Sequence, residues 1–88
     1  MNDADWLKQN RELHNMTQSN IASYLEVVTG ENVNQGRVVS IEHGDMEIPV
    51  DWRQVLVPLF DTLKVGWGIE GITWRAFVPI MLRSRGLA

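Results

Sequence analysis

The chain has 88 residues, contains no cysteine and is 44% apolar, with a formal net charge of −3. This composition predicts one small globular domain and excludes disulfide bonds, cysteine-ligated zinc and thiol catalysis. A cysteine-free chain suits a reducing compartment, and its longest apolar run falls far short of the ~20 residues that span a bilayer. We therefore expect a cytoplasmic protein that makes no contact with a membrane.

The charge is divided unevenly along the chain. Residues 1–50 contain three basic and eight acidic side chains, a net charge of −5, whereas residues 51–88 contain five basic and three acidic side chains, a net charge of +2. Proteins that bind nucleic acid usually present a basic surface. The acidic amino-terminal half therefore favours a basic protein as an alternative partner.

Two acidic residues near the start of the chain predict a first helix. Asp3 or Asp5 is expected to cap it, because acidic side chains at a helix start accept hydrogen bonds from the free amides and suit the helix dipole. The helix is expected to run to about His14. Asn15 follows, and asparagine tolerates the left-handed backbone conformation that commonly ends a helix.

A second helix is predicted to begin after Thr17, whose hydroxyl can accept from a first-turn amide. Its apolar residues recur at the spacing of one buried helical stripe: Ile21, Ala22, Leu25 and Val28. Gly30 suits the residue that follows a helix end, because glycine adopts positive φ without strain.

A third helix is predicted to begin after Asn34, a second capping residue. Val38 and Ile41 lie three positions apart and mark its buried side. His43 and Gly44 end this helix. It is therefore short and has only a narrow apolar stripe.

Two further helices are predicted in the second half of the chain. Pro49 and Asp51 open the fourth helix, and Pro58 lies inside it. The last helix is expected over residues 73–85 and contains Pro79. Each internal proline is expected to bend its helix or to remove one backbone hydrogen bond.

Three segments of the chain resemble the lambda-repressor/Cro-like (XRE) helix-turn-helix family. They are Met16-Thr17-Gln18, then Ile21-Ala22-Ser23-Tyr24-Leu25, then Val38-Val39-Ser40-Ile41-Glu42-His43-Gly44. The resemblance covers roughly residues 6 to 63. It implies an all-α, lambda-repressor-like helix-turn-helix bundle of four to five helices plus a C-terminal helix.

The connection between the second and third helices departs from the common pattern of that family. About six extra residues, around positions 27 to 32, lengthen it. The POU-specific domain is similar in this respect, and from Thr17 to Glu42 the chain aligns with its pattern without a gap. The resemblance thus implies a domain over residues 1–64 that binds DNA, followed by a C-terminal helical extension over residues 65–88.

The resemblance also implies which residues contact DNA. Gln35 is the leading base reader, because a glutamine amide can bond N6 and N7 of adenine together. Gln18 is expected beside the DNA backbone, where it can also brace Gln35, and Glu42 is expected to bond within the domain. The complete DNA-contacting set is Gln18, Asn34, Gln35, Gly36, Arg37, Val39 and Ser40.

The remaining members of this set have individual expectations. Ser40 matches a groove-facing position, and Val39 can touch a thymine methyl group. Arg37 can contact either a phosphate or a guanine. Gly36 stands where many relatives carry a longer polar side chain, so one base contact is expected to be missing.

The predicted function is that of a sequence-specific DNA-binding transcriptional regulator, a repressor, with a recognition helix at about residues 34–43 in the major groove. It is expected to act as a homodimer through Trp67, Trp74, Phe77 and Met81, because aromatic residues are enriched at interfaces. The alternative is an acidic protein-interaction module on the same fold, an antitoxin-like or inhibitory protein. Neither a catalytic constellation nor a metal-binding spacing is present, so we expect no enzyme activity, metal or cofactor.

Overall fold

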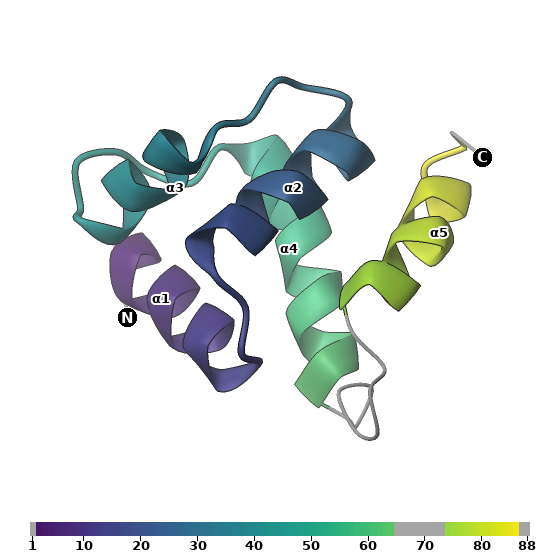
Figure 1. The fold of residues 1–88 in the computed structure, drawn as a ribbon, viewed down its shortest axis with the longest axis horizontal. Coiled ribbons are helices and arrows are strands. Elements are labelled where there is room, and N and C mark those ends of the chain that lie inside the picture. The colour runs from purple at the N-terminus through teal and green to yellow at the C-terminus, as the bar shows by residue number, and fades with distance from the viewer. Residues whose placement is uncertain (1, 65–73, 87–88) are drawn as a thin grey trace.

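The computed structural model describes residues 2–64 and 74–86. Within these residues the protein consists of helices and contains no strand, which confirms the predicted all-α class (Figure 1). The helices are α1 (Asp3–Leu13), α2 (Gln18–Thr29), α3 (Gln35–Glu42), α4 (Val50–Thr62) and α5 (Trp74–Ser84).

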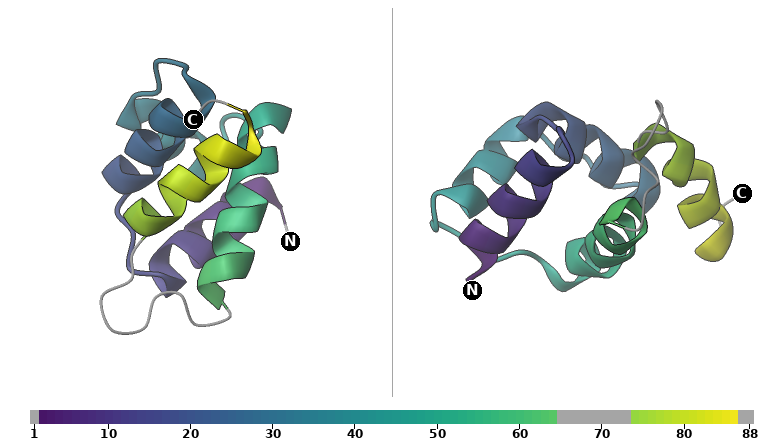
Figure 2. Two further views of the ribbon diagram at one scale, coloured as in Figure 1. Left: turned by 90° about the vertical axis from the view of Figure 1, so that its right-hand side faces the viewer. Right: turned by 90° about the horizontal axis from the view of Figure 1, so that it is seen from below.

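Helix α2 lies at the centre of the arrangement. It packs against α3, α4 and α5, while α1 packs against α3. Figure 1 and the right-hand view of Figure 2 show α5 at one end of the molecule and α1 and α3 at the other. The exposed surface of α3 is therefore remote from the C-terminal helix.

The core is formed mainly by α2 and α4. Tyr24 and Trp52 are fully buried, and Phe60 is 2% exposed. The predicted stripe on α2, from Ile21 to Val28, is buried as well. Burial of each large apolar side chain contributes about 1.5–3 kcal/mol. Helix α3 packs on this core through α2 and is supported on its other side by α1.

The predicted helix boundaries around α2 and α3 are confirmed. Thr17 and Asn20 form a capping box, in which the Thr17 Oγ1 accepts from the Asn20 amide at 3.0 Å and the Asn20 Oδ1 accepts from the Thr17 amide at 2.9 Å. Asn34 caps α3 by accepting from the Arg37 amide at 3.0 Å. Asn15 and Gly30 have positive φ values of 56° and 76°.

The prediction that Asp3 or Asp5 caps α1 is wrong. Asn2 is the capping residue, and its Oδ1 accepts from the Asp5 amide at 2.8 Å. The Asp3 carboxylate is engaged elsewhere, because it accepts from the Ile48 amide at 2.9 Å and pairs with Arg53. Asp3 therefore ties the start of α1 to the segment that leads into α4.

Pro58 lies inside α4 and Pro79 inside α5, as predicted. A proline has no amide hydrogen, so each helix lacks one backbone hydrogen bond at that position. Both helices continue because apolar residues on either side of the proline remain buried: Val55 and Leu59 in α4, and Phe77 and Met81 in α5.

Helix α5 joins the same core through aromatic contacts. The ring of Tyr24 lies 6.1 Å from that of Trp74 and 6.4 Å from that of Phe77, and the Tyr24 hydroxyl donates to the Val55 carbonyl at 2.6 Å. Phe77 and Met81, which the sequence assigned to a dimer contact, are 5% and 6% exposed within the single chain. They are therefore core residues of α5.

Two other residues of that predicted dimer contact have different positions. Trp74 is partly buried against the core. Trp67 lies outside the described residues. On α5 the large apolar side chain that is exposed is Ile80, at 43%.

Candidate nucleic-acid interface

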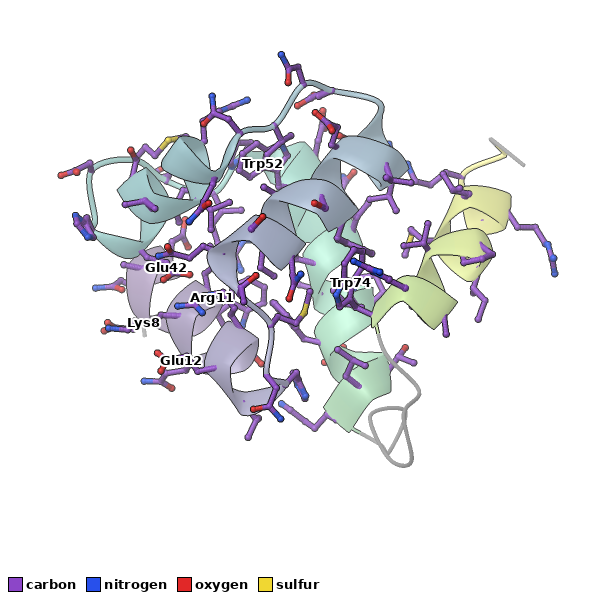
Figure 3. The ribbon with its side chains drawn as sticks, viewed as in Figure 1. Lys8, Arg11, Glu12, Glu42, Trp52 and Trp74 are labelled. Carbon is purple, nitrogen blue, oxygen red and sulfur yellow. The ribbon has the colours of Figure 1, made fainter. Side chains whose placement is uncertain are left out.

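An ion pair joins α1 to the end of α3. Arg11 Nε lies 2.7 Å from Glu42 Oε2, and Arg11 Nη2 donates to Glu42 Oε1 at 2.9 Å. Figure 3 shows the two side chains facing each other between these helices. The Arg11 and Glu42 side chains are only 13% and 3% exposed. The hydrogen bond to Glu42 raises the pKa of Arg11 above its ordinary value, in opposition to burial. The expectation that Glu42 bonds within the domain is confirmed.

Two further contacts extend this pair to the start of α2. The third nitrogen of Arg11, Nη1, donates to the Met16 carbonyl at 3.0 Å. Gln18 Nε2 donates to Glu42 Oε1 at 3.1 Å. The buried charges are therefore satisfied by hydrogen bonds as well as by each other, which is the condition under which a buried ion pair is tolerated. The partner of Gln18 is thus Glu42, whereas the sequence suggested Gln35.

The exposed surface of α3 carries the remaining predicted residues. Val38 and Ile41 are fully buried against the domain, as predicted. On the other sides of the helix Asn34, Gln35 and Gly36 are exposed, and Arg37, Val39 and Ser40 are partly buried. With 100° between successive helical residues, Gly36, Val39 and Ser40 lie opposite the buried stripe, and Gln35 and Arg37 lie on its two flanks.

Gly36 is placed beside the cap of its own helix. A Cβ atom at this position would lie 3.1 Å from Asn34 Oδ1, the atom that accepts from the Arg37 amide. A larger residue here would therefore press on the capping side chain. This gives a local reason for the glycine where a longer polar side chain was expected.

A groove of about 590 Å³ brings part of the predicted set together. Its lining residues include Lys8, Arg11, Gln18, Gln35, Glu42 and His43. Gln18 and Gln35 therefore share one depression at the junction of α2 and α3. Asn34, Gly36, Arg37, Val39 and Ser40 do not line it.

Lys8 and His43 are residues of this groove that sequence reasoning did not assign to the site. Lys8 lies one helical turn before Arg11, and residues three apart share a helix face. That spacing was visible in the sequence, but nothing local marked α1 as part of the interface. Lys8 projects from the outer side of α1, with Glu12 one turn further along the helix (Figure 3).

Arg37 lies on the opposite flank of α3 and contacts α4. Its guanidinium carbon is 4.5 Å from the centroid of the Trp52 ring. The Trp52 Nε1 in turn donates to Glu31 Oε2 at 3.2 Å. The lengthened connection between α2 and α3 is therefore attached to α4 through this indole.

Four of the eight acidic residues of the first half accept hydrogen bonds within the fold. Glu42 pairs with Arg11, Asp3 with Arg53, and Glu31 accepts from Trp52. Glu26 accepts from the Val33 amide at 3.4 Å. Only Glu42 and Asp3 are paired with a positive charge, whereas Glu26 and Glu31 bond to neutral donors and are exposed, so their charges remain at the surface.

The groove itself is not acidic. Among its lining residues, the formal charges of Lys8, Arg11 and Glu42 sum to +1. Because the Glu42 charge is paired and buried, the charge closest to solvent in this set is that of Lys8, which is exposed. This surface is compatible with an anionic ligand despite the overall charge of the chain.

Comparison with protein-family models, curated proteins and solved structures finds no match for this chain. In the part of the chain that the structure describes, no group of three or more His, Asp or Glu side chains is placed to hold a metal ion. None of the described helices is long and apolar enough to cross a membrane.

Proposed function

We propose that the protein is a sequence-specific DNA-binding transcriptional regulator with a lambda-repressor-like helix-turn-helix arrangement, in which α3 enters the major groove. The observation that carries this proposal is the cluster of Arg11, Glu42 and Gln18. It fixes the start of α2 against the end of α3 and leaves Gln35 exposed in the same groove. A helix that enters a DNA groove must be held firmly by the rest of its domain and must expose polar side chains.

The start of α2 supplies a contact to the DNA backbone. The amides of Gln18 and Ser19 belong to the first turn, where helix geometry provides no intrahelical acceptor. The Asn20 amide is already bonded to Thr17. The two remaining amides and the positive end of the helix dipole favour a phosphate. The exposed ammonium of Lys8 lines the same groove and adds a positive charge.

Base reading is assigned to the exposed surface of α3. Gln35 is placed on the flank nearest Gln18 and can donate and accept at an adenine edge. Val39 and Ser40 face outward on the same helix and offer a methyl contact and a hydroxyl. Acting as a homodimer, the protein would place two copies of α3 in half-sites about one DNA turn apart.

A selection from random duplexes, combined with titration of the enriched and a scrambled duplex, tests this function. We expect a pseudo-palindromic site bound by a dimer, with the dimer mass measured by analytical ultracentrifugation. Gln35→Ala is expected to weaken binding to the enriched duplex by about 1–3 kcal/mol and to leave the scrambled duplex unaffected. Gln54→Ala, an exposed glutamine of α4 that does not line the groove, is the matched control.

Two outcomes would contradict the proposal. Equal loss of affinity for both duplexes on Gln35→Ala would remove the base-reading role. Failure of the wild-type protein to bind any duplex at low salt would remove the function itself, because phosphate contacts provide non-specific affinity at low salt.

The second candidate function is the acidic protein-interaction module. It is favoured by another groove, of about 580 Å³, whose lining includes Asp3, Asp45 and Glu47. The Asp45 and Glu47 side chains are exposed and suit a basic protein partner. The duplex titration separates the two candidates, since a module of this kind binds no duplex at low salt.

A further inference from the structure

The guanidinium of Arg37 is held in a defined position. It lies over the ring of Trp52, with 4.5 Å between the guanidinium carbon and the ring centroid. Trp52 belongs to the first turn of α4 and is fully buried. A rigid core residue therefore provides the surface on which this side chain of α3 is stacked.

The other edge of the same indole is bound to the connection between α2 and α3. Trp52 Nε1 donates to Glu31 Oε2 at 3.2 Å. A carboxylate that accepts from the indole polarises the ring toward greater negative charge, and the face of an electron-rich ring attracts a cation. Glu31 thus acts on Arg37 through Trp52 and strengthens the stacking.

The stacked guanidinium keeps its hydrogen-bond donors available. Stacking uses the face of the group, whereas the N–H donors lie in its plane. Among residues 2–64 and 74–86, no carboxylate lies within ion-pair distance of Arg37; the ion pairs there join Arg11 to Glu42 and Arg53 to Asp3. A planar guanidinium with open edges matches the paired oxygens of a phosphate.

Arg37 and Gln35 lie on different flanks of α3. Residues two apart on an α-helix are separated by about 200° around its axis. Gln35 shares a groove with Gln18, whereas Arg37 is directed to α4. A helix in the major groove has a phosphate backbone on each side, so these two flanks face different backbones.

We propose that Arg37 binds a DNA phosphate, and that Trp52 and Glu31 are positioning residues that act through it. The proposal rests on the proposed DNA-binding function and resolves the two roles that the sequence left open for Arg37. It assigns α3 a backbone contact on the α4 side, opposite the contact expected from Gln18 and the start of α2.

The first test removes the charge of Arg37 and keeps the aliphatic part of its side chain. Arg37→Met is expected to lower affinity for enriched and scrambled duplexes by the same factor, about eightfold at 0.1 M salt. The slope of log K against log salt concentration is expected to fall by about 0.9, the value of one phosphate contact. Gln35→Ala, measured in parallel, is expected to affect the enriched duplex alone.

The second test uses a substitution for which positioning and simple electrostatics predict opposite changes in DNA affinity. Glu31→Ala removes a negative charge, which by long-range electrostatics alone would strengthen DNA binding. Positioning requires the opposite: Glu31→Ala weakens binding. Glu31→Gln restores it in part, because the amide oxygen still accepts from the indole but carries no full charge. Once Arg37→Met is present, neither change weakens binding. Glu47→Ala, an exposed acidic control, is expected to bind DNA no more weakly than the wild type.

The outcomes separate this inference from the function on which it rests. Unchanged affinity and salt slope for Arg37→Met, while Gln35→Ala still loses discrimination, would overturn the phosphate contact and leave the DNA-binding function intact. Tighter binding by Glu31→Ala would overturn the positioning role. Absence of binding to any duplex by the wild-type protein would overturn the proposed function and, with it, the inference.

Discussion

Arg11 and Arg37 lie beside opposite flanks of α3 and use their charges in different ways. Arg11 is 13% exposed and directs its nitrogens to Glu42 and to the Met16 carbonyl. Arg37 is stacked on Trp52, with its donors directed to no carboxylate in the described part of the chain. One arginine holds α3 in place, and the other is available to a ligand. The net charge of a chain does not distinguish these two cases.

The comparison shows that two arginines beside one helix can have different partners. A buried ion pair removes one positive and one negative charge from the surface together. Glu42 is neutralised in this way by Arg11 of α1, whereas Glu31 accepts only from the neutral indole of Trp52 and keeps its charge at the surface. What a ligand meets beside α3 is therefore set by which charges remain unpaired.

The largest expected effect comes from breaking the pair on the Arg11 side. Glu42→Ala leaves the Arg11 guanidinium buried without its counter-charge, and this is expected to cost about 3–5 kcal/mol of the free energy of unfolding. Urea denaturation of the wild type and the variant measures it. A loss below about 1 kcal/mol would show that Arg11 escapes to solvent, and the pair would not fix α3.

A double variant separates the charge from the space it fills. Arg11→Met combined with Glu42→Leu removes both charges and keeps most of the side-chain volume. It is expected to recover much of the stability lost by Glu42→Ala, because apolar replacements of buried pairs are often neutral or stabilising. DNA binding is expected to recover less, since Gln18 then has no carboxylate to hold it.

Local features of the sequence predicted most of the helix boundaries. Thr17 and Asn34 cap helices with hydrogen bonds to residues three positions away. Gly30 and Asn15 adopt positive φ at helix ends. These interactions depend on neighbours within one turn, so the residue type at the position is enough to predict them.

Contacts between distant segments were not predictable in the same way. The contact of Trp52 with Glu31 joins residues 21 apart, and the pairing of Arg53 with Asp3 joins residues 50 apart. Asp3 was expected to cap a helix because capping requires only a local amide. Its actual partners come from α4 and the segment before it, and no local pattern in the sequence specifies them.

In the candidate site, too, some features were predictable from the sequence and contacts between distant segments were not. The resemblance placed Gln18 and Gln35 at one interface, and the structure brings both to one groove. It did not include Lys8 or the stacking of Arg37. Phe77 and Met81 were expected at a dimer surface because the sequence does not show that α5 packs on α2. This packing buries both side chains within the single chain.

An intermediate effect is expected from the start of α2, which carries Gln18 and lies next to the Met16 carbonyl that Arg11 binds. Thr17→Ala removes the Thr17 half of the capping box and is expected to cost about 1 kcal/mol of the free energy of unfolding. Urea denaturation measures it. Ser19→Ala is the control, because Ser19 is an exposed residue of α2 whose side chain makes no capping bond. An equal loss of unfolding free energy for both changes would contradict the capping role.

The smallest expected effect is a pH dependence at the end of α1, on the Arg11 side of the comparison. His14 packs against Phe60, with 6.0 Å between ring centroids, and its Nε2 is buried without a hydrogen bond to any described residue. Burial lowers the pKa of His14 below its ordinary value of 6.5, and the nearby charge of Lys64 lowers it further. The unfolded chain therefore takes up the proton at a higher pH than the folded one.

It follows that the contribution of His14 to stability is complete above pH 6.5 and is lost progressively as the pH falls below that value. Urea denaturation at a series of pH values from 7.5 downward measures this loss. His14→Gln is expected to flatten the dependence, and Lys64→Met is expected to reduce it only in part, because burial is the larger cause of the shift. An unchanged pH dependence in His14→Gln would show that another group is responsible. Neither change is expected to alter the contacts of Arg11 or Arg37, since neither arginine titrates in this range.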